Sequence, residues 1–323
     1  MIKFIFKRLL MMIPVLIGVS FVIFSMLYFA PGDAADVILG DMATPADKQL
    51  FREQNGLDKP FLIQYFRYMR GIIVEGDLGT SYVTRQPVTV EILERFPTTL
   101  KLAALSVLLS VIIGVTVGIV SATRQYSFID HLFTSLSMIG VSMPNFWQGM
   151  MLIIVFSVWL RWFPPSGFST PIHWVLPAIT VGTNASANIM RMTRSSMLEI
   201  IRQDYIRTAR AKGQTEAVVI WKHALKNALI PIITVIGLSF GRLLGGAVLT
   251  ESIFSIAGVG KLMVDAIKLK NFPMVQGGVL FIAFVMSLVN LVVDVLYSFA
   301  DPRIRSMYTR PKAKKVVMAK EAA

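Results

Sequence analysis

Residues Asp204 to Pro231 read DYIRTARAKGQTEAVVIWKHALKNALIP, a basic stretch that lies between two strongly apolar segments. Gly213 divides it into two short helical pieces. We expect Asp204 to cap the first piece by accepting a free backbone N–H. Arg210 and Lys212 fall in its last turn, where cations oppose the negative end of the helix dipole, and Gly213 suits a left-handed stop. A short, basic helix with such a defined end is suited to docking on another protein.

The whole chain has the composition of a polytopic α-helical membrane protein. Of its 323 residues, 54% are hydrophobic and 16% are charged, the mean hydropathy is +0.64, and the apolar residues form long runs. The net charge of +13 lies mostly in loops beside these runs, and no nucleic-acid-binding motif accompanies it. We therefore expect no nucleic-acid partner. The chain has no cysteine, so disulfides and thiolate metal sites are excluded.

Six apolar stretches are long enough to cross a bilayer, so we expect six transmembrane helices. The first follows the positively charged MIKFIFKRLL, but it is long for a signal peptide and has no A-x-A site, so we interpret it as a retained anchor. The fourth is the most polar, because Asn184 and Asn188 interrupt it. The expected spans are Leu9–Ala30, Thr98–Ala122, Leu132–Leu160, Val175–Met192, Leu229–Leu249 and Gly277–Ala300.

The distribution of basic residues indicates which side of the membrane is cytoplasmic. The two tails, the turn with Arg124 and the central loop hold more than half of the lysine and arginine residues. By the positive-inside rule these parts, including both termini, are cytoplasmic. The expected organisation is an N-terminal tail and first helix (1–30), an extracytoplasmic helical loop (31–97), a core of five transmembrane helices (98–300) and a basic cytoplasmic tail (301–323).

The extracytoplasmic loop is too patterned to be a simple connection. Ala46–Gln54 and Pro60–Ile73 are amphipathic with prolines near their starts, and GDLGTS at Gly76–Ser81 punctuates the return to the membrane. We expect a small helical cap that either contacts a soluble partner or braces the outer ends of the spans. The Gly-interrupted segment Glu251–Pro273 is either a re-entrant segment that closes the outer mouth or an ordinary surface loop.

The sequence offers no catalytic set. His131, His173 and His223 stand far apart, and the chain contains no H-E-x-x-H, G-x-S-x-G or P-loop motif. We therefore expect a non-catalytic membrane subunit that binds no metal and no cofactor. Any ATP that drives it must bind to another chain.

Polar residues inside the expected spans are functional candidates, because hydrocarbon makes ionisable groups costly unless they are paired or wetted. Arg242 lies midway along the fifth span, and Asp294 lies in the sixth with Asn290 four residues earlier on the same face. Pro144 interrupts the third span and is expected to kink it. These residues either belong to a wet translocation path or hold the helix bundle together.

Eight motifs, in order along nearly the whole chain, resemble those of the inner-membrane permease subunits of ATP-binding-cassette importers. The match is to the B-type subunit of oligopeptide and dipeptide importers, a group that includes nickel and glutathione importers. The motifs are GLDKP (Gly56–Pro60), GDLGTS (Gly76–Ser81), GVSMPNFW (Gly140–Trp147), MRMTRSSMLE (Met190–Glu199), DYIRTARAKG (Asp204–Gly213), HALKNALIP (His223–Pro231), LLGGAVLTESIF (Leu243–Phe254) and DPRIR (Asp301–Arg305).

The resemblance implies the all-α transmembrane domain of a type I importer, with a cytoplasmic coupling helix that docks on an ATPase. The family pattern E-A-A-x-x-x-G corresponds here to Arg207-Thr208-Ala209-x-x-x-Gly213, so an arginine replaces the acid. Lys226 stands where a family proline is expected, and Ala257 where relatives often have proline. The implied coupling residues are Asp204, Tyr205, Arg207, Thr208, Ala209, Arg210, Lys212 and Gly213.

The resemblance also implies the partners. These are a homologous second permease, two ATPase subunits that bind ATP and Mg, an extracytoplasmic solute-binding protein and the lipid of a bacterial inner membrane. The implied cargo is di- or oligopeptides, with nickel or glutathione as alternatives. A secondary transporter is the alternative from another class, but the chain has no convincing internal repeat and a single clear intramembrane acid, Asp294.

Overall fold

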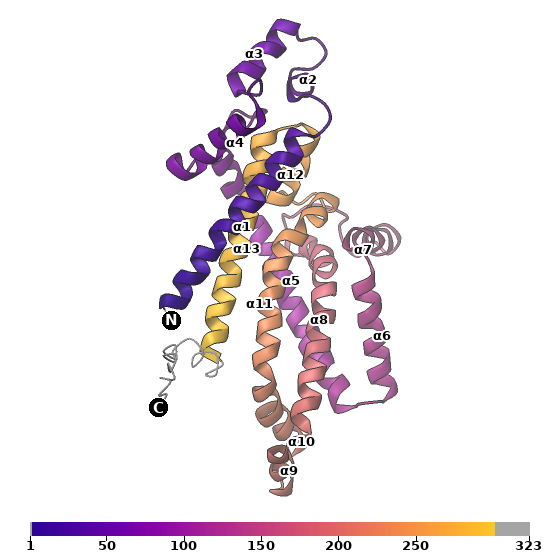
Figure 1. The fold of residues 1–323 in the computed structure, drawn as a ribbon. Helices are drawn as coiled ribbons and strands as arrows, with labels where there is room; N and C mark the ends of the chain where they lie inside the picture. Colours follow the sequence, from indigo (N-terminus) through magenta and orange to yellow (C-terminus); the bar gives the residue numbers. More distant parts are fainter. Residues whose placement is uncertain (1, 301–323) are drawn as a thin grey trace, which may run out of the picture.

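The computed structural model describes residues 2–300, and the side chains of residues 2–4, 246 and 296–300 are left out of the description. The fold is a bundle of long helices with a small helical cap at one end and short helices at the other (Figure 1). We call these the cap end and the loop end. The long helices are α1 (Ile2–Tyr28), α5 (Val88–Thr123), α8 (Val175–Ile201), α11 (Leu225–Ile253) and α13 (Phe272–Ala300).

The shorter elements lie between these helices. The cap holds α2 (Ala34–Leu39), α3 (Pro45–Asn55), α4 (Phe61–Arg70) and the π-helix η1 (Gly71–Glu75). Between α5 and α8 come α6 (Phe128–Ser142), α7 (Asn145–Leu152), the π-helix η2 (Ile153–Trp159) and a 3-10 turn η3 (Pro171–Trp174). The loop end holds α9 (Asp204–Ala211), α10 (Glu216–Val218) and the π-helix η4 (Val219–Ala224), and α12 (Val259–Lys268) precedes α13.

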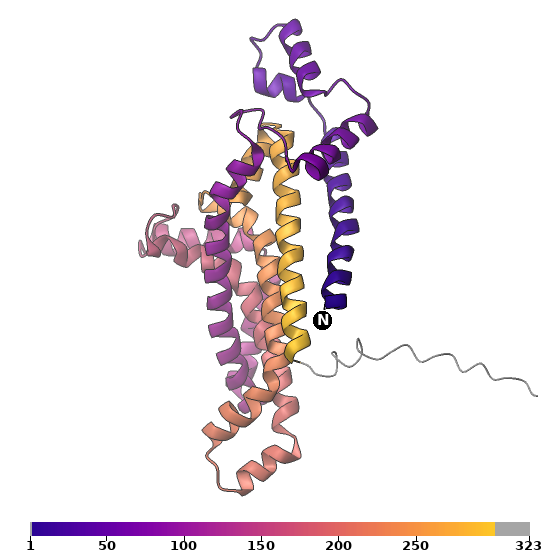
Figure 2. The same cartoon turned by 90° about the vertical axis from the view of Figure 1, so that its left-hand side faces the viewer.

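The third expected span is interrupted at Pro144, as predicted, but the bend there is much sharper than a kink. Within residues 2–300, four helices are long and apolar enough to cross a membrane, and a fifth crossing results only if α6 and the α7–η2 helix count as one broken span. The two parts meet at an angle of 107°, so α7 lies across the bundle rather than along it (Figures 1 and 2). The break follows from Pro144, which lacks an N–H donor, and from Met143 before it, which is extended.

The fourth expected span forms a helix but is less apolar than the others. α8 is a continuous helix of 27 residues, but its sequence is too polar for it to count among the strongly apolar helices. Some of its polar residues face neighbouring helices, since Thr180 and Thr193 are fully buried. Helix α5 also differs from expectation at its start. It begins at Val88 and runs through Pro97, so it extends into the stretch expected to be loop.

The cap is helical, and α3 and α4 occupy the two stretches for which amphipathic helices are expected. Thr44 and Asp47 form a reciprocal capping box at the start of α3, with Pro45 in the first helical position. Gly56 ends α3 in the left-handed conformation, with φ +68°. α12 is also a helix, with Val259, Met263 and Ala266 on its buried face. The segment after Glu251 is therefore packed structure and not an ordinary surface loop.

The close contact between α5 and α8 is the most extensive in the bundle. A Cβ on Gly118 would lie 2.6 Å from the Cβ of Thr193, and one on Gly114 would lie 2.7 Å from the carbonyl oxygen of Ser186. Ser110 on α5 donates a hydrogen bond of 2.8 Å to the carbonyl oxygen of Gly182 on α8. Small residues thus let the two backbones approach closely, as in other membrane helix pairs.

We expect Gly118→Ala to destabilise the protein by about 1–3 kcal/mol, because the new methyl group overpacks the contact with Thr193. The matched control is Gly18→Ala on α1, where nothing lies within 4 Å of the new Cβ. The control is expected to be neutral or slightly stabilising, since alanine is favoured over glycine in helices by about 1 kcal/mol. Thermal unfolding of both variants in detergent measures the difference. Equal midpoints would contradict the packing argument.

Candidate functional site

The loop helix α9 is anchored to the bundle by one apolar face. Ile206 and Ala209 are buried in a cluster that also contains Ile119 of α5, Met197 of α8 and Val219 of η4. The opposite face is exposed, with 98% of the Asp204 side chain and 76% of the Arg207 side chain accessible. Of the remaining expected coupling residues, Tyr205, Thr208, Arg210, Lys212 and Gly213 are exposed, and only Ala209 faces inward.

The end of α9 is defined by backbone geometry and by one ion pair. Gly213 has φ +77°, and its N–H donates to the carbonyl of Arg210 at 2.9 Å. The Arg210 guanidinium then bridges to Glu216 at the start of α10, with Nε–Oε1 at 2.7 Å and Nη2–Oε2 at 3.3 Å. A second contact closes the turn, since Gln214 Oε1 lies 2.6 Å from His223 Nε2. The loop is therefore a compact hairpin of helices.

Asp204 does not cap α9 as expected. The N-cap is Gln203, which holds an extended conformation and makes no side-chain hydrogen bond to the helix. Asp204 is the first residue of the helix itself and not the residue before it. From this position its carboxylate does not accept the backbone N–H bonds that an N-cap side chain accepts. Its charge still lies in the first turn, next to the positive end of the helix dipole.

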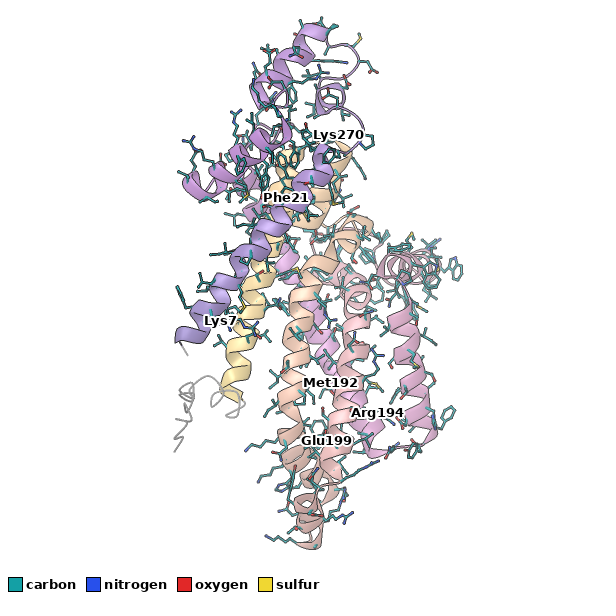
Figure 3. The ribbon with its side chains drawn as sticks, viewed as in Figure 1. Lys7, Phe21, Met192, Arg194, Glu199 and Lys270 are labelled. Carbon is teal, nitrogen blue, oxygen red and sulfur yellow. The ribbon has the colours of Figure 1, made fainter. Side chains whose placement is uncertain are left out.

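The strongest polar contact at the loop end, between Asp130 and Arg194, was not predicted from the sequence. The Arg194 guanidinium on α8 binds both carboxylate oxygens of Asp130 on α6, each at 2.7 Å. Ser121 at the end of α5 donates to the same carboxylate, and the backbone N–H of Tyr126 donates to it at 3.0 Å. Asp130 is 2% exposed, and Figure 3 shows Arg194 on the side of α8 that faces α6. This contact joins three helices directly above α9.

The four polar residues expected in the translocation path or in the bundle network do not form one cluster. Asp294 on α13 pairs with Arg8 on α1, with Nη1–Oδ2 at 3.0 Å. Arg242 is exposed, and its guanidinium donates a hydrogen bond of 3.3 Å to Ser239 Oγ of its own helix. Asn290 lies against α11, with Oδ1 3.2 Å from where a Cβ on Gly241 would be. Pro144 is exposed at the break between α6 and α7.

A buried carboxylate at the cap end was likewise not singled out from the sequence. Glu251, at the end of α11, is fully buried and accepts hydrogen bonds from Thr99 Oγ1 at 2.6 Å and from the Lys261 N–H at 3.1 Å. Burial raises the pKa of this carboxyl, and these hydrogen bonds oppose the shift. A Cβ on Gly258 would collide with the carboxylate at 2.3 Å. The glycines of GVG therefore make room for Glu251, which ties α11 to α5 and α12.

We expect Asp130→Asn to lower the free energy of unfolding by about 3 kcal/mol, because it leaves the Arg194 guanidinium without its counter-charge in a largely buried position. The control is Asp265→Asn, which breaks the half-exposed pair with Lys261 and is expected to cost under about 1 kcal/mol. Unfolding by denaturant in detergent gives both values. A loss no larger than that of the control would show that the buried pair does not hold the loop end.

The chain matches known families and proteins over nearly its full length. Residues 114–306 match the family described as "Binding-protein-dependent transport system inner membrane component", and residues 1–103 match its N-terminal counterpart. The chain is 44% identical to the dipeptide transport system permease protein DppB of Alkalihalophilus pseudofirmus, over 94% of this chain and 100% of that one. It is 43% identical to the di/tripeptide permease DppB of Pseudomonas aeruginosa, over 94% and 99% of the two chains. It is 41% identical to the glutathione permease GsiC of Salmonella paratyphi A, over the same shares.

A solved structure shares the fold. A chain of the inward-facing MetNI methionine ABC transporter superposes with a TM-score of 0.52 at 20% identity, covering 66% of this chain and 97% of that one. The expected type I importer fold is thereby confirmed. The chain belongs to the binding-protein-dependent transport system inner-membrane components, the permease subunits of ATP-binding-cassette importers.

Proposed function

We propose that this permease subunit forms half of a path for di- and oligopeptides across the bacterial cytoplasmic membrane. The observation that carries the proposal is its identity of 44% and 43%, over 94% of the chain, to permeases named for dipeptides and for di- and tripeptides. The glutathione permease at 41% is also named for a molecule built of three amino acids. Glutathione and nickel remain the alternative cargoes.

The proposed assembly has four further members. A homologous second permease completes the path, two ATPase subunits bind ATP and Mg, and an extracytoplasmic solute-binding protein delivers the peptide. In this arrangement the present chain catalyses no reaction. Both termini and α9 face the cytoplasm, as the positive-inside rule predicts, and the cap faces outward.

Helix α9 is proposed to transmit the movement of an ATPase to the bundle. Its exposed face, with Tyr205, Arg207, Arg210 and Lys212, makes the contact. Its buried residues Ile206 and Ala209 connect that contact to α5, α8 and η4. ATP drives transport in this scheme only if the ATPase pair binds one arrangement of the bundle more tightly than the other.

The polar residues of the bundle are proposed to have separate roles. An arginine in the middle of a span is costly in lipid, so the exposed Arg242 requires a water-filled path or a protein neighbour. We assign Arg242 and Asn290 to the path, where α11 and α13 meet. Asp294 is assigned to the bundle network because it pairs with Arg8. Pro144 is assigned to the turn that redirects α7.

Peptide transport is tested by uptake of a radiolabelled dipeptide into proteoliposomes that hold the whole importer with its solute-binding protein. We expect ATP-dependent uptake that unlabelled di- and oligopeptides reduce and Ni²⁺ does not. Accumulation of Ni²⁺ without peptide uptake would refute the proposal, and competition by glutathione alone would favour the glutathione alternative.

Coupling is tested with Gly213→Pro and Arg210→Glu in the same importer. Proline requires a negative φ and cannot adopt +77°, and glutamate at 210 repels Glu216, so both changes distort the contact face. We expect normal membrane insertion, ATPase activity that no longer responds to loaded binding protein, and at least a tenfold loss of uptake. Arg124→Glu, a charge reversal on the same side but outside the loop, is the control. Wild-type coupling in both variants would contradict docking through α9.

The double variant Arg210→Glu/Glu216→Arg separates two causes. It restores the ion pair within the loop while it exchanges the charges on the surface. Continued uncoupling in this variant is the expected result, because the contact with the ATPase depends on the charges themselves. Full recovery would instead assign Arg210 to the internal stability of the loop.

A further inference from the structure

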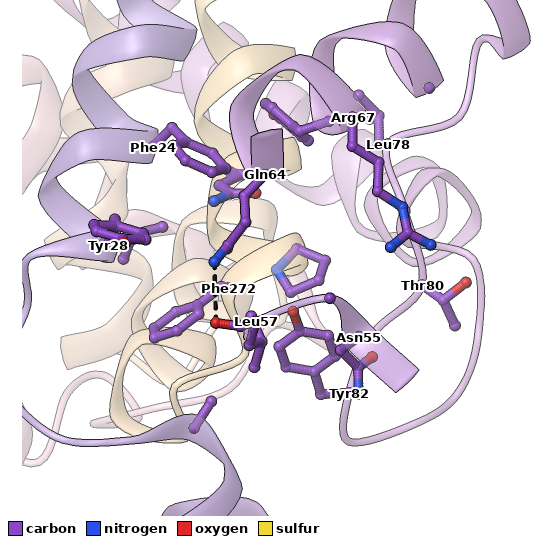
Figure 4. Close-up of a pocket in the computed structure, with 18 of the residues that line it drawn as sticks. Phe24, Tyr28, Asn55, Leu57, Gln64, Arg67, Leu78, Thr80, Tyr82 and Phe272 are labelled. Carbon is purple, nitrogen blue, oxygen red and sulfur yellow. Dashed lines mark hydrogen bonds between the residues drawn. The ribbon is translucent and has the colours of Figure 1, made fainter. Parts of the chain in front are cut away.

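The cap end contains a cavity of about 960 Å³ that lies outside the functions discussed above. Its walls come from the outer end of α1, the connection between α3 and α4, the helix α4, the turn before α5 and the first residues of α13 (Figure 4). Its volume falls at the upper end of the range of about 300–1,000 Å³ that is usual for ligand pockets.

Side-chain clamps hold the walls of this cavity in place. Gln64 on α4 donates to the carbonyl oxygens of Leu57 at 3.0 Å and Lys59 at 2.7 Å, which fixes the GLDKP turn. Asn271, before α13, is 4% exposed; it donates to Ser81 Oγ at 2.8 Å and accepts from the Tyr82 N–H at 2.9 Å. The cavity is therefore framed by the motifs GLDKP and GDLGTS, which the docking of α9 does not explain.

Several polar groups line the cavity without a partner in the described part of the chain. Arg67 is exposed, and its guanidinium lies so close to Gly56 that a Cβ there would be 2.6 Å from Nη1. It forms no ion pair with a described residue, although its charge acts on the Asp58 carboxylate. The Tyr68 hydroxyl is buried and has no hydrogen-bond partner. Burial raises the pKa of Tyr82 to about 12, while the nearby positive charge of Arg67 opposes the shift. Figure 4 shows Arg67 and Tyr82 reaching into the same space from different segments.

The cavity also has negative and aromatic walls. Glu75 and Asp77 line it, and neither forms an ion pair with a described residue. Phe24, Tyr28 and Phe272 supply aromatic surface. A ligand that satisfies all these groups carries a negative end, a positive end and an apolar side chain. A short peptide with free termini has this combination.

We propose that the cap cavity binds short zwitterionic peptides directly, with the peptide carboxylate on Arg67 and the Tyr82 hydroxyl and the ammonium group near Glu75 and Asp77. This inference rests on the proposed peptide transport. It adds that the permease has a peptide site of its own, at the outer face and separate from the one on the solute-binding protein.

The test measures binding to the complete permease–ATPase complex in phosphatidylcholine nanodiscs, without the solute-binding protein. Radiolabelled Ala-Phe is the probe. We expect saturable binding to the wild type and at least a tenfold weaker affinity for the C-terminal amide of the same peptide, since a hydrogen bond to a charged group is lost. Absence of saturable binding to the wild type would overturn the inference.

Variants locate the site. Arg67→Ala is expected to weaken binding at least tenfold, Arg67→Lys less, and Tyr82→Phe about three- to tenfold because it removes one hydroxyl and keeps the ring. Arg95→Ala is the matched control, an exposed arginine on the outer part of α5 that does not line the cavity. Thermal unfolding confirms that each variant is folded. Binding by both Arg67→Ala and Tyr82→Phe as tight as by the control would overturn the assignment.

Two further results separate this inference from its alternatives. If native mass spectrometry shows retained phosphatidylglycerol that depends on Arg67, and the peptide does not bind, the cavity is a lipid site and the inference is wrong. Uptake by the same complex with its solute-binding protein distinguishes the two proposals. Peptide uptake without direct binding refutes only the cap site, whereas loss of peptide uptake in the wild type refutes the proposed transport function.

Discussion

In a bilayer, apolar side chains gain little by leaving lipid for a neighbouring helix, so close backbone packing and polar contacts must hold the helices together. α5 and α8 meet this constraint with Gly114, Gly118 and the Ser110 hydrogen bond along their contact. At the loop end the buried pair of Asp130 and Arg194 adds α6 to the same unit. Because α9 packs on the ends of α5 and α8, this contact gives the loop a fixed base.

The same helices also carry the cap end. Thr99 of α5 and Glu251 of α11 bind each other and the backbone at the start of α12, through Val259 and Lys261. α5 and α11 therefore have one end in the cluster that anchors α9 and the other in the contacts beneath the cap. Two continuous helices thus connect the base of α9 with the cap end, without a further connecting element. This geometry is consistent with the proposed role of α9 in coupling.

The sequence predicts the helices of this fold better than it predicts their contacts. Long apolar runs and an internal proline are local features, so the helices and the break at Pro144 follow from them, although the angle of 107° does not. Asp130 and Arg194 lie 64 positions apart and pair only through the arrangement of α6 and α8. The pairing of Asp294 with Arg8 has the same origin. The sequence predicts Asp204 as the N-cap of α9, whereas the N-cap is Gln203, one position earlier. Both residues precede the apolar periodic stretch, so the pattern alone does not distinguish them.

Two polar sites at the cap end, Glu251 and the cavity beside Tyr68, differ in whether their buried groups have hydrogen-bond partners. Glu251 is fully buried, and both of its carboxylate oxygens accept hydrogen bonds from neighbouring helices, so it needs nothing from outside. The Tyr68 hydroxyl is buried without a hydrogen-bond partner, and the exposed Arg67 at the same cavity forms no ion pair with a described residue. A buried polar group left unpaired costs about 1–3 kcal/mol, a cost that a ligand of matching polarity removes when it binds. Glu251 is therefore an element of the fold, whereas the unpaired Tyr68 hydroxyl supports the proposal that the cavity binds a ligand.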